Sequence, residues 1–235
     1  MTLVKGRGFD SWRRVGSVMQ AVKVYNMRDV DELIFVDITA TNDKQRPDFQ
    51  LVDDFADECF MPLTVGGGVK TLDDVGRLLE VGADKVSINS ATFADPKLIS
   101  ISADMYGSQC VVASIDFKYN TSKKKYEVFS HSGKITTGKD PIKHALDVEK
   151  YGAGEILLTS INRDGTMDGY DLNITKKIAQ EVKIPVISSG GAGNYEHMYE
   201  VLSIKGVEGA AAASIFHFTE QTPLEAKAYL QKKGI

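Results

Sequence analysis

The sequence predicts an α/β fold, a (β/α)8 TIM barrel built from two homologous half-barrels, with the first strand absent from the chain. Short β-branched runs alternate with amphipathic helical patterns along the whole length. The two halves of the chain also repeat one another at a fixed offset. Strands separated by helices pair in parallel through right-handed crossovers. A doubly wound open sheet is the main alternative, and the repeat favours a barrel over it.

The repeat is visible in two pairs of aligned segments. Residues 32–40 (ELIFVDITA) align with residues 155–163 (EILLTSINR), and the same offset carries Gly67-Gly68 onto Gly190-Gly191. After one inserted residue, GADKVSINS at 82–90 aligns with GVEGAAAAS at 206–214. An apolar run at 111–116 opens the second half, and its partner in the first half would fall before Met1. We therefore expect one barrel domain over residues 1–235 that lacks strand 1.

The individual elements follow from hydrophobic periodicity. The helices at 72–81 and 141–151 each place apolar side chains on one face, for example Val75, Leu78 and Leu79 in the first of them. The predicted strands cover residues 33–38, 62–65, 85–88, 111–115, 155–159, 186–188 and 209–213. Active sites of this fold lie at the carboxyl ends of its strands, so functional side chains are expected there.

Composition restricts the class of protein. The 235 residues are 43% hydrophobic and 26% charged, which suits one large core. A net charge of -4 argues against nucleic acid as the main partner. No apolar stretch is long enough to span a membrane and residues 1–10 lack a secretion signal, so a cytoplasmic location is expected. The two cysteines show no metal-ligand spacing or disulfide framework, and neither a metal nor a cofactor is expected.

Two glycine-rich loops indicate phosphate binding. Residues 66–68 (GGG) and 190–193 (GGAG) each follow an apolar strand and precede a helix. Backbone N–H groups can approach an anion there because no Cβ stands in the way, although a plain strand-to-helix turn is the alternative. Two equivalent loops at one barrel mouth predict an elongated substrate with a phosphate at each end. Small polar segments at equivalent places, Asn89-Ser90 and Ala213-Ser214, would complete the two cradles.

Carboxylates close several strands. Asp116 ends the run VASID and is the best candidate for a catalytic acid or base. Asp37 ends LIFVD, where a helix cap or an indirect hydrogen-bond acceptor is an equal alternative to direct catalysis. Asp164 lies in RDGT, a turn composition that is compatible with substrate binding. Thr159 and Ser189 end two further strands and are expected near the substrate. The four histidines follow no ligand spacing, so solvated or structural roles are expected for them.

Longer motifs extend over nearly the whole chain: DITA at 37–40, TVGGG at 64–68, ADKVSIN at 83–89, GAGEILLTS at 152–160, RDGTMDGYD at 163–171, SGGAG at 189–193 and AASIFHF at 212–218. Together they resemble the cyclase subunit of imidazole glycerol phosphate synthase. The sister isomerase of histidine biosynthesis shares the barrel and the doubled loops but not the GAGEILLTS segment. The resemblance implies a lyase that uses ammonia and a bis-phosphorylated aminoimidazole carboxamide ribonucleotide. Its products would be imidazole glycerol phosphate and the carboxamide ribonucleotide.

The resemblance also implies roles for matching residues. Asp116 matches one of two catalytic aspartates, and the other belongs to the absent strand. Lys5 matches the lysine of a mobile first loop that closes on substrate. Glu32, Lys85 and Glu155 match a charged ring that admits ammonia from a glutaminase subunit docked on the N-terminal barrel face; a structural salt-bridge ring is the alternative. The phosphate-binding ends match Gly68, Asn89, Ser90, Gly165, Gly191, Ala213 and Ser214.

Two departures from the family pattern keep other functions open. The absent strand would carry the second catalytic acid and a basic member of the charged ring, so the chain without it is expected to be nearly inactive. The loop at 8–16 (GFDSWRRVG) looks more like paralogues associated with surface polysaccharides, in which ammonia would serve to amidinate a sugar. A third possibility is a non-catalytic scaffold for a glutaminase, which would not need paired phosphate cradles.

Overall fold

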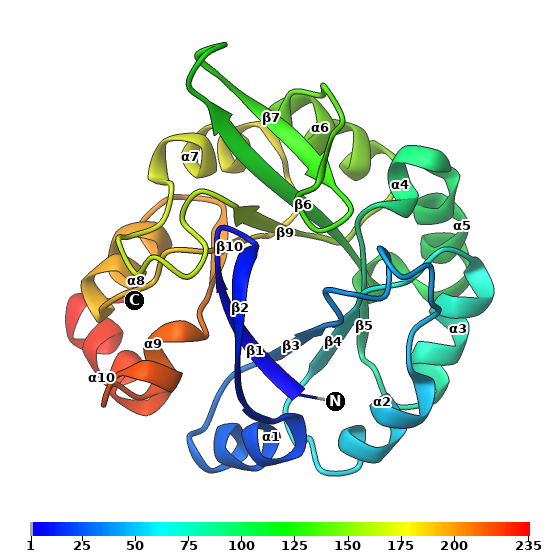
Figure 1. The fold of residues 1–235 in the computed structure, drawn as a ribbon. Coiled ribbons are helices and arrows are strands. Elements are labelled where there is room, and N and C mark those ends of the chain that lie inside the picture. Colours follow the sequence, from blue (N-terminus) through cyan, green and yellow to red (C-terminus); the bar gives the residue numbers. More distant parts are fainter. Residues whose placement is uncertain (1) are drawn as a thin grey trace.

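A curled parallel sheet forms the centre of the computed structural model, which describes residues 2–235 (Figure 1). Its seven strands pair in the order β11-β10-β9-β6-β5-β4-β3, and every neighbouring pair is parallel. All seven correspond to strands predicted from the sequence. Their bounds are β3 Leu33–Val36, β4 Leu63–Gly66, β5 Lys85–Ile88, β6 Val111–Asn120, β9 Glu155–Ser160, β10 Val186–Ser189 and β11 Val207–Ala211.

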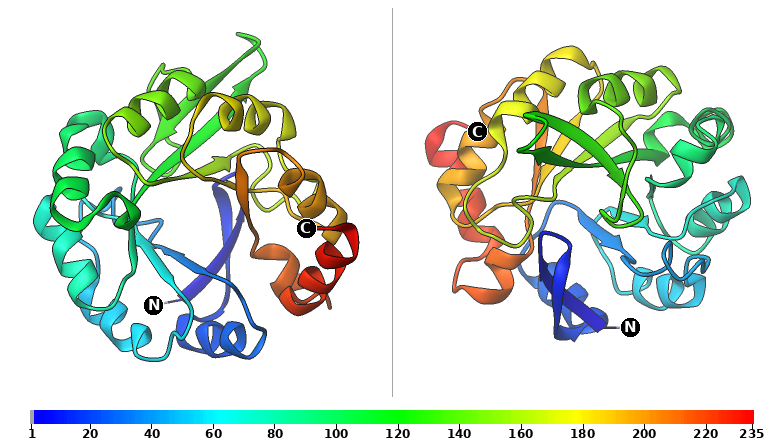
Figure 2. Two further views of the ribbon diagram at one scale, coloured as in Figure 1. Left: turned by 180° about the vertical axis from the view of Figure 1, so that it is seen from behind. Right: turned by 45° about the horizontal axis from the view of Figure 1, so that its top comes forward.

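The helices surround the sheet on its outer side (Figures 1 and 2). A doubly wound sheet would carry helices on both faces, so this arrangement confirms the TIM-barrel type of fold. The two helices predicted by residue range are present as α3 and α6. The helices are α1 Val18–Met27, α2 Phe49–Ala56, α3 Leu72–Glu80, α4 Ala91–Ala94, α5 Lys97–Tyr106, α6 Pro141–Lys150, α7 Leu172–Glu181, α8 Tyr195–Leu202, α9 Ser214–Phe218 and α10 Pro223–Lys233, with a 3-10 turn at Ser108–Cys110.

The main core lies between the strands and the surrounding helices. Successive side chains of a strand point to opposite faces of the sheet, and one set packs on the helices. Val86, Ile115 and Ile156 belong to this set and are completely buried. The other set, which includes Ser87, Asp116 and Thr159, faces the inside of the curled sheet. The alternation thus separates an apolar outer layer from a more polar interior.

The curled sheet is open on one side. Within residues 2–235, β3 and β11 pair on one edge only, and no eighth strand joins them. Val36 lies on the interior face of β3 and is 44% exposed, which is unusual for an apolar side chain in a barrel strand. This arrangement agrees with the predicted absence of strand 1. Unpaired strand edges of this kind present free backbone N–H and C=O groups.

Two antiparallel hairpins were not predicted. Residues of the expected first loop form β1 Thr2–Arg7 and β2 Asp10–Ser17, which pair only with each other and lie between β3 and α9 (Figure 1). The second hairpin forms because β6 continues beyond the predicted end at residue 115. Its extension pairs with β7 Lys125–Ser130, which in turn pairs with β8 Ile135–Thr136. Both hairpins lie at the end of the sheet where the strands terminate.

Candidate functional site

Asp116 lies within β6, where the parallel pairing with β9 ends and the antiparallel pairing with β7 begins, and its side chain faces the interior of the sheet. It is only 8% exposed, and the amide Nδ2 of Asn89 donates a hydrogen bond of 2.8 Å to its Oδ2. Burial raises the pKa of the Asp116 carboxyl to about 7, Asn89 acts to lower it, and the charge of Asp164 raises it further. A carboxyl with this pKa exchanges a proton near neutral pH, as a general acid or base requires.

The strand register brings other predicted residues beside Asp116. Asp116 is the parallel partner of Thr159 on β9, and Thr159 is the partner of Ser189 on β10. The Oδ1 atom of Asn89 is buried and has no hydrogen-bond partner among the described residues. A buried acceptor without a hydrogen bond destabilises the fold unless water or a ligand donates one to it. The mouth therefore offers a substrate a free hydrogen-bond acceptor.

Asp37 is engaged by its own turn at the end of β3. Its Oδ1 accepts hydrogen bonds from the Thr39 backbone N–H at 2.8 Å, the Thr39 hydroxyl at 2.9 Å and the Ala40 N–H at 3.1 Å. These contacts correspond to the capping alternative, because they fix the loop that follows the strand. The Oδ1 atom of Asp37 therefore helps to fix the loop at this side of the mouth.

The hairpin β1–β2 contacts the loop that carries Asp164. The Gly8 N–H donates to the Asp164 carbonyl at 2.9 Å, and a Cβ on Gly165 would lie 2.1 Å from the Gly6 carbonyl oxygen. Burial raises the pKa of the Asp164 carboxyl, while a hydrogen bond from the Phe9 backbone and the charge of Lys5 act to lower it. The hairpin tip thus covers one side of the mouth.

Lys5 lies on β1, and its ammonium group faces an aromatic ring at the end of α9. Its Nζ lies 4.2 Å from the centre of the Phe218 ring, and the Arg13 guanidinium lies 4.5 Å from the same ring. Burial lowers the pKa of Lys5, and the neighbouring charge of Arg13 adds to this effect. The two cations, which are partners in the β1–β2 register, hold the middle of the hairpin against α9.

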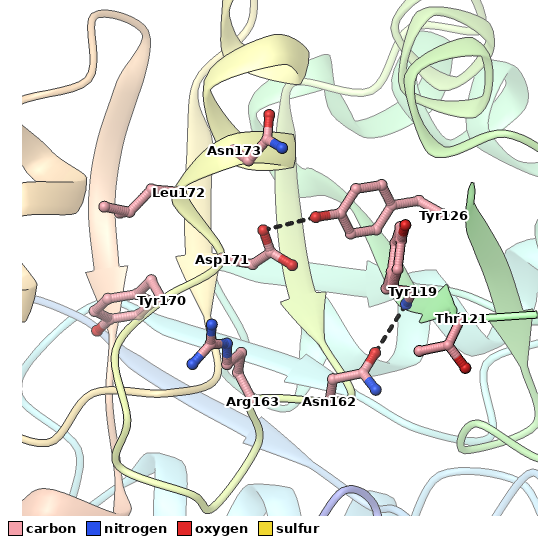
Figure 3. Close-up of a pocket in the computed structure, with 9 residues that line it drawn as sticks. All are labelled: Tyr119, Thr121, Tyr126, Asn162, Arg163, Tyr170, Asp171, Leu172 and Asn173. Atoms are coloured by element: carbon pink, nitrogen blue, oxygen red, sulfur yellow. Dashed lines mark hydrogen bonds between the residues drawn. The ribbon is translucent and has the colours of Figure 1, made fainter. Parts of the chain in front are cut away.

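A cavity of about 550 Å³ lies on the other side of the Asp164 loop, outside the mouth (Figure 3). It is bounded by the β6–β7 hairpin and by the chain between β9 and α7. None of the residues predicted from the sequence lines it. The pattern of the sequence did not indicate it because one wall is the unpredicted hairpin.

The two glycine-rich loops come after β4 and β10, as predicted. Gly68 and Gly191 have φ of +75° and +115°, which favour glycine. A Cβ on Gly191 would also lie 2.1 Å from the Gly169 carbonyl oxygen. The glycines therefore have a packing role, and this role is compatible with an anion approaching their N–H groups. The short helices α4 and α9 follow the adjacent strands, and the residues before them, Ser90 and Ala213, form no side-chain cap.

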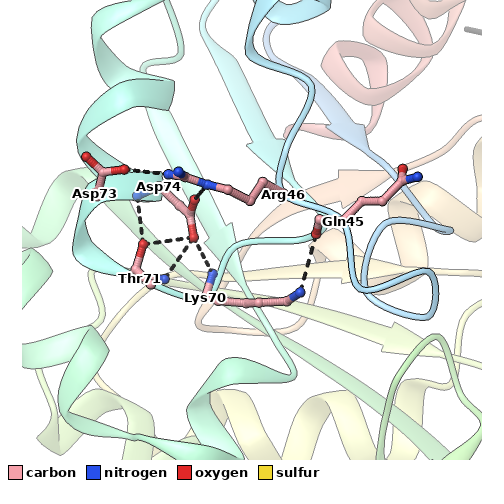
Figure 4. A network of polar contacts seen from close by, with 6 residues as sticks. All are labelled: Gln45, Arg46, Lys70, Thr71, Asp73 and Asp74. Carbon is pink, nitrogen blue, oxygen red and sulfur yellow. Dashed lines mark hydrogen bonds and ion pairs between the residues drawn. The ribbon is translucent and has the colours of Figure 1, made fainter.

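A polar network fixes the chain that covers the first glycine loop (Figure 4). The Nε of Arg46 donates to Asp74 at 2.7 Å, and Arg46 also pairs with Asp73. Asp74 is the N3 residue of a capping box with Thr71 at the start of α3. Although burial acts to raise it, hydrogen bonds from Lys70, Arg46 and Thr71 lower the pKa of the Asp74 carboxyl. The network joins the loop after β3 to α3.

The tip between β7 and β8 also reaches the mouth. His131, Ser132 and Gly133 have φ of 53°, 54° and 75°, a run of left-handed residues that is strained for the first two. The His131 N–H donates to Ser90 Oγ at 2.9 Å, and the Ser132 hydroxyl donates to the Ile38 carbonyl at 2.7 Å. The sequence did not predict a site role for His131. Its contact with Ser90 exists only because the hairpin folds back onto the mouth.

The other histidines contact helices or the second glycine-rich loop. His144 is 2% exposed and stacks on Phe93 with ring centres 4.7 Å apart. His197 accepts a hydrogen bond from the Gly193 N–H at 3.2 Å, and His217 shares one of 2.8 Å with the Tyr25 hydroxyl. Within residues 2–235 no group of three histidine, cysteine, aspartate or glutamate side chains is placed to hold a metal ion.

The predicted charged ring forms at the opposite end of the sheet, where the strands begin. Lys85 Nζ lies 2.9 Å from Glu32 Oε2 and 2.7 Å from Glu155 Oε2. Although burial acts to lower it, hydrogen bonds to Glu155 and Glu32 raise the pKa of Lys85. The lysine stays charged, and its side chain bridges two carboxylates over the interior of the sheet.

Small hydroxyl side chains connect the ring to the mouth. On β5, residues 85, 87 and 89 share one face, so Ser87 lies between Lys85 and Asn89 along the interior. Ser114 occupies the corresponding position on β6, between the start of the strand and Asp116. Thr64 of β4 is the partner of Lys85 and adds a third hydroxyl. This interior surface can hydrogen-bond a small polar molecule along its length.

A comparison with protein families agrees with the fold. The family described as histidine biosynthesis protein has a model that matches residues 1–222. The match includes both glycine loops, Asp116 and the charged ring. Among the described residues, no helix is both long enough and apolar enough to cross a membrane.

Proposed function

From the premise that this chain belongs to the histidine biosynthesis protein family, we propose that it is the cyclase subunit of imidazole glycerol phosphate synthase. One observation carries the proposal. A carboxyl with a pKa near 7 and a Glu-Lys-Glu ring occupy opposite ends of the same interior surface. This arrangement fits an enzyme in which a small nucleophile enters at one end of the barrel, past the charged ring. The larger substrate is then held at the other end, beside the carboxyl.

In the proposed reaction, the bis-phosphorylated ribonucleotide lies across the mouth with one phosphate at each glycine loop. Ammonia attacks the substrate, one water is lost, and ring closure with cleavage of the bond to the leaving ribonucleotide yields imidazole glycerol phosphate and the carboxamide ribonucleotide. Asp116 takes up a proton as the nitrogen adds and returns it to a leaving group. Asn89 holds the carboxyl in place through its 2.8 Å hydrogen bond. Binding both phosphates fixes the reacting carbon and nitrogen atoms near Asp116.

The proposal includes a glutaminase partner on the face that carries the charged ring. Ammonia is mostly protonated at neutral pH, so direct delivery of the unprotonated form favours its use as a nucleophile. Helix ends at this face expose apolar side chains: Met27 at the end of α1 is 78% exposed and Met105 near the end of α5 is 62% exposed. Phe60, which precedes β4, is 83% exposed. Exposed methionine and phenylalanine around a charged ring fit a protein interface.

A second candidate is amidination of a sugar by the same ammonia route. The hairpin β1–β2 favours it, because its tip contacts Asp164 and Gly165 at the mouth and thereby changes the space for the acceptor. In this case the charged ring still admits ammonia, and the hydroxyl-lined interior surface still leads it to the mouth. The acceptor would then carry a sugar in place of the aminoimidazole ribonucleotide.

Product analysis distinguishes the two. The full-length protein is supplied with the bis-phosphorylated ribonucleotide and excess ammonium salt. The formation of imidazole glycerol phosphate is measured by mass spectrometry. We expect its formation, with Asp116→Asn slower by about 100-fold or more. A wild-type protein that binds the ribonucleotide but yields no imidazole product would contradict the cyclase and favour the sugar acceptor.

A further inference from the structure

The cavity outside the mouth has the size and the lining of a small-molecule site. Its volume of about 550 Å³ is within the range of ligand pockets. It shares the loop after β9 with the mouth, but its side chains come from the outer side of that loop. The lining residues are Tyr119, Thr121, Tyr126, Asn162, Arg163, Tyr170, Asp171, Leu172 and Asn173.

Aromatic rings form one wall (Figure 3). Tyr119 and Tyr126, on β6 and β7, meet edge to face with ring centres 5.0 Å apart. Phe117 supports Tyr126 from the core, with ring centres 5.7 Å apart. Tyr119 is 38% exposed, so part of its ring remains open to a ligand. The rings are fixed by the hairpin and offer a rigid apolar surface.

Planar polar groups lie beside these rings (Figure 3). The Tyr126 hydroxyl donates to Asp171 Oδ1 at 3.1 Å, which orients the carboxylate. Arg163 Nη1 donates to the Asp168 carbonyl at 3.2 Å, and within residues 2–235 its guanidinium has no ion-pair partner. The Asn162 Oδ1 accepts from the Tyr119 N–H at 2.8 Å, which leaves the amide NH2 as a donor. Each planar group is anchored at one atom and has further hydrogen-bonding capacity.

The chemistry of these walls selects the ligand class. An isolated anion would pair with Arg163 but would meet the carboxylate of Asp171 in the same cavity. A purely apolar ligand would desolvate both charges without replacing their hydrogen bonds. A neutral ring with several hydroxyl groups satisfies both: hydroxyls donate to Asp171, accept from Arg163 and Asn162, and the C–H face of the ring packs on Tyr119.

We propose that this cavity binds a neutral pyranose sugar, at a site separate from the mouth. Asn162 and Arg163 directly precede Asp164 and Gly165 in the chain. A bound sugar therefore orders the loop whose inner side contacts the hairpin β1–β2. Binding itself does not depend on the ammonia chemistry proposed above, because no residue of the cavity belongs to that machinery.

Nuclear magnetic resonance titration of the isotopically labelled full-length protein tests the site. Glucose and N-acetylglucosamine are the probes, and inorganic phosphate is the anionic comparison. We expect shifts centred on the Tyr119 backbone amide and the Asn162 side-chain amide, with a Kd of about 1–10 mM. Three results would each overturn the proposal. The chemical shift changes could be confined to the glycine loops, or be absent at about 50 mM of either sugar, or phosphate could displace the sugar.

Tyr119→Ala removes the stacking surface and should weaken sugar binding about 3- to 10-fold. Tyr151→Ala is the matched control, because Tyr151 is 37% exposed and lies at the end of α6, outside the cavity. Asn173→Leu alters the side of the cavity that α7 contributes without touching the hairpin, and a loss of affinity is expected for this variant as well. Equal affinities of wild type, Tyr119→Ala and Asn173→Leu would overturn the site even if the sugar bound elsewhere.

Discussion

Asn89 donates a 2.8 Å hydrogen bond to Asp116 across the junction of β5 and β6, and this bond opposes the effect of burial on the carboxyl. Burial favours the protonated acid, whereas the amide N–H stabilises the carboxylate. The balance leaves the pKa of Asp116 at about 7. The two residues together, rather than the aspartate alone, set the pKa of the carboxyl near neutral pH.

Asn89→Leu should therefore raise the pKa of Asp116. The carboxylate form becomes scarcer at pH 7, and the ascending limb of the pH–rate profile moves to higher pH. Measuring kcat/KM with ammonium salt from pH 5.5 to 9 gives the shift, with buffers checked for constant folding by circular dichroism. Asp116→Asn should abolish that limb. An ascending limb at the same pH in wild type and Asn89→Leu would contradict the coupling between the two residues.

Burial of His144 predicts a loss of stability in acid. The imidazole is 2% exposed, neither nitrogen has a hydrogen-bond partner among the described residues, and burial lowers its pKa to about 4 from 6.5. The unfolded chain thus binds the proton first. The stabilising contribution is complete above pH 6.5 and is lost as the pH falls to about 4, on the order of 3 kcal/mol.

His144→Phe keeps a ring against Phe93 and removes the titrating group. The free energy of unfolding, measured in urea at pH 7.5 and pH 4.5, should fall less between the two values for this variant than for wild type. His197→Phe is the comparison, because His197 lies on the outer helix α8. The same pH dependence in wild type and His144→Phe would show that other groups control acid stability.

Periodicity predicted the seven parallel strands because each is a short apolar run between helices, and the repeat predicted their grouping into halves. The position of Asp116 near the end of the parallel part of β6, and the charges at strand starts, followed from the same pattern. The hairpins were missed for a physical reason. The extension of β6 contains Lys118 and Tyr119, so it is not a continuous apolar run. It forms a strand because it pairs with β7, not because its side chains are buried. His131 and Arg46 reach the mouth through contacts distant in sequence, which no local pattern encodes.

The Arg46 network should affect substrate affinity more than turnover. Arg46→Ala removes the contacts to Asp73 and Asp74 and frees the loop that covers Gly68. We expect KM for the phosphorylated substrate to rise about 5- to 10-fold with kcat nearly unchanged, because in the proposed reaction the loop holds a phosphate and not the reacting atoms. Arg77→Ala is the control, since Arg77 also packs on the Phe49 ring, at 3.9 Å, but contacts neither aspartate. Similar KM values for the two variants would exclude the network from substrate binding.

Lys85 tests whether the charged ring controls ammonia or only stabilises the barrel. Its Nζ bridges Glu32 and Glu155 at the end of the interior opposite Asp116. Lys85→Ala leaves two carboxylates without their cation and opens the interior to solvent. If the ring is a gate, glutamine-dependent turnover with the glutaminase present should fall about 10-fold or more. Turnover with excess ammonium salt should fall far less, because free ammonia can enter from either end.

Lys227 provides a matched control, because it also bridges two carboxylates, Asp29 at 3.0 Å and Asp31 at 2.9 Å, and lies outside the ring. Its side chain is 28% exposed, close to the 20% of Lys85. Lys227→Ala should change neither activity, while the ratio of glutamine-dependent to ammonium-dependent turnover should drop only in Lys85→Ala. A structural ring gives another result: both activities and the melting temperature of Lys85→Ala would decrease together with no change in that ratio, and the gate would then be excluded.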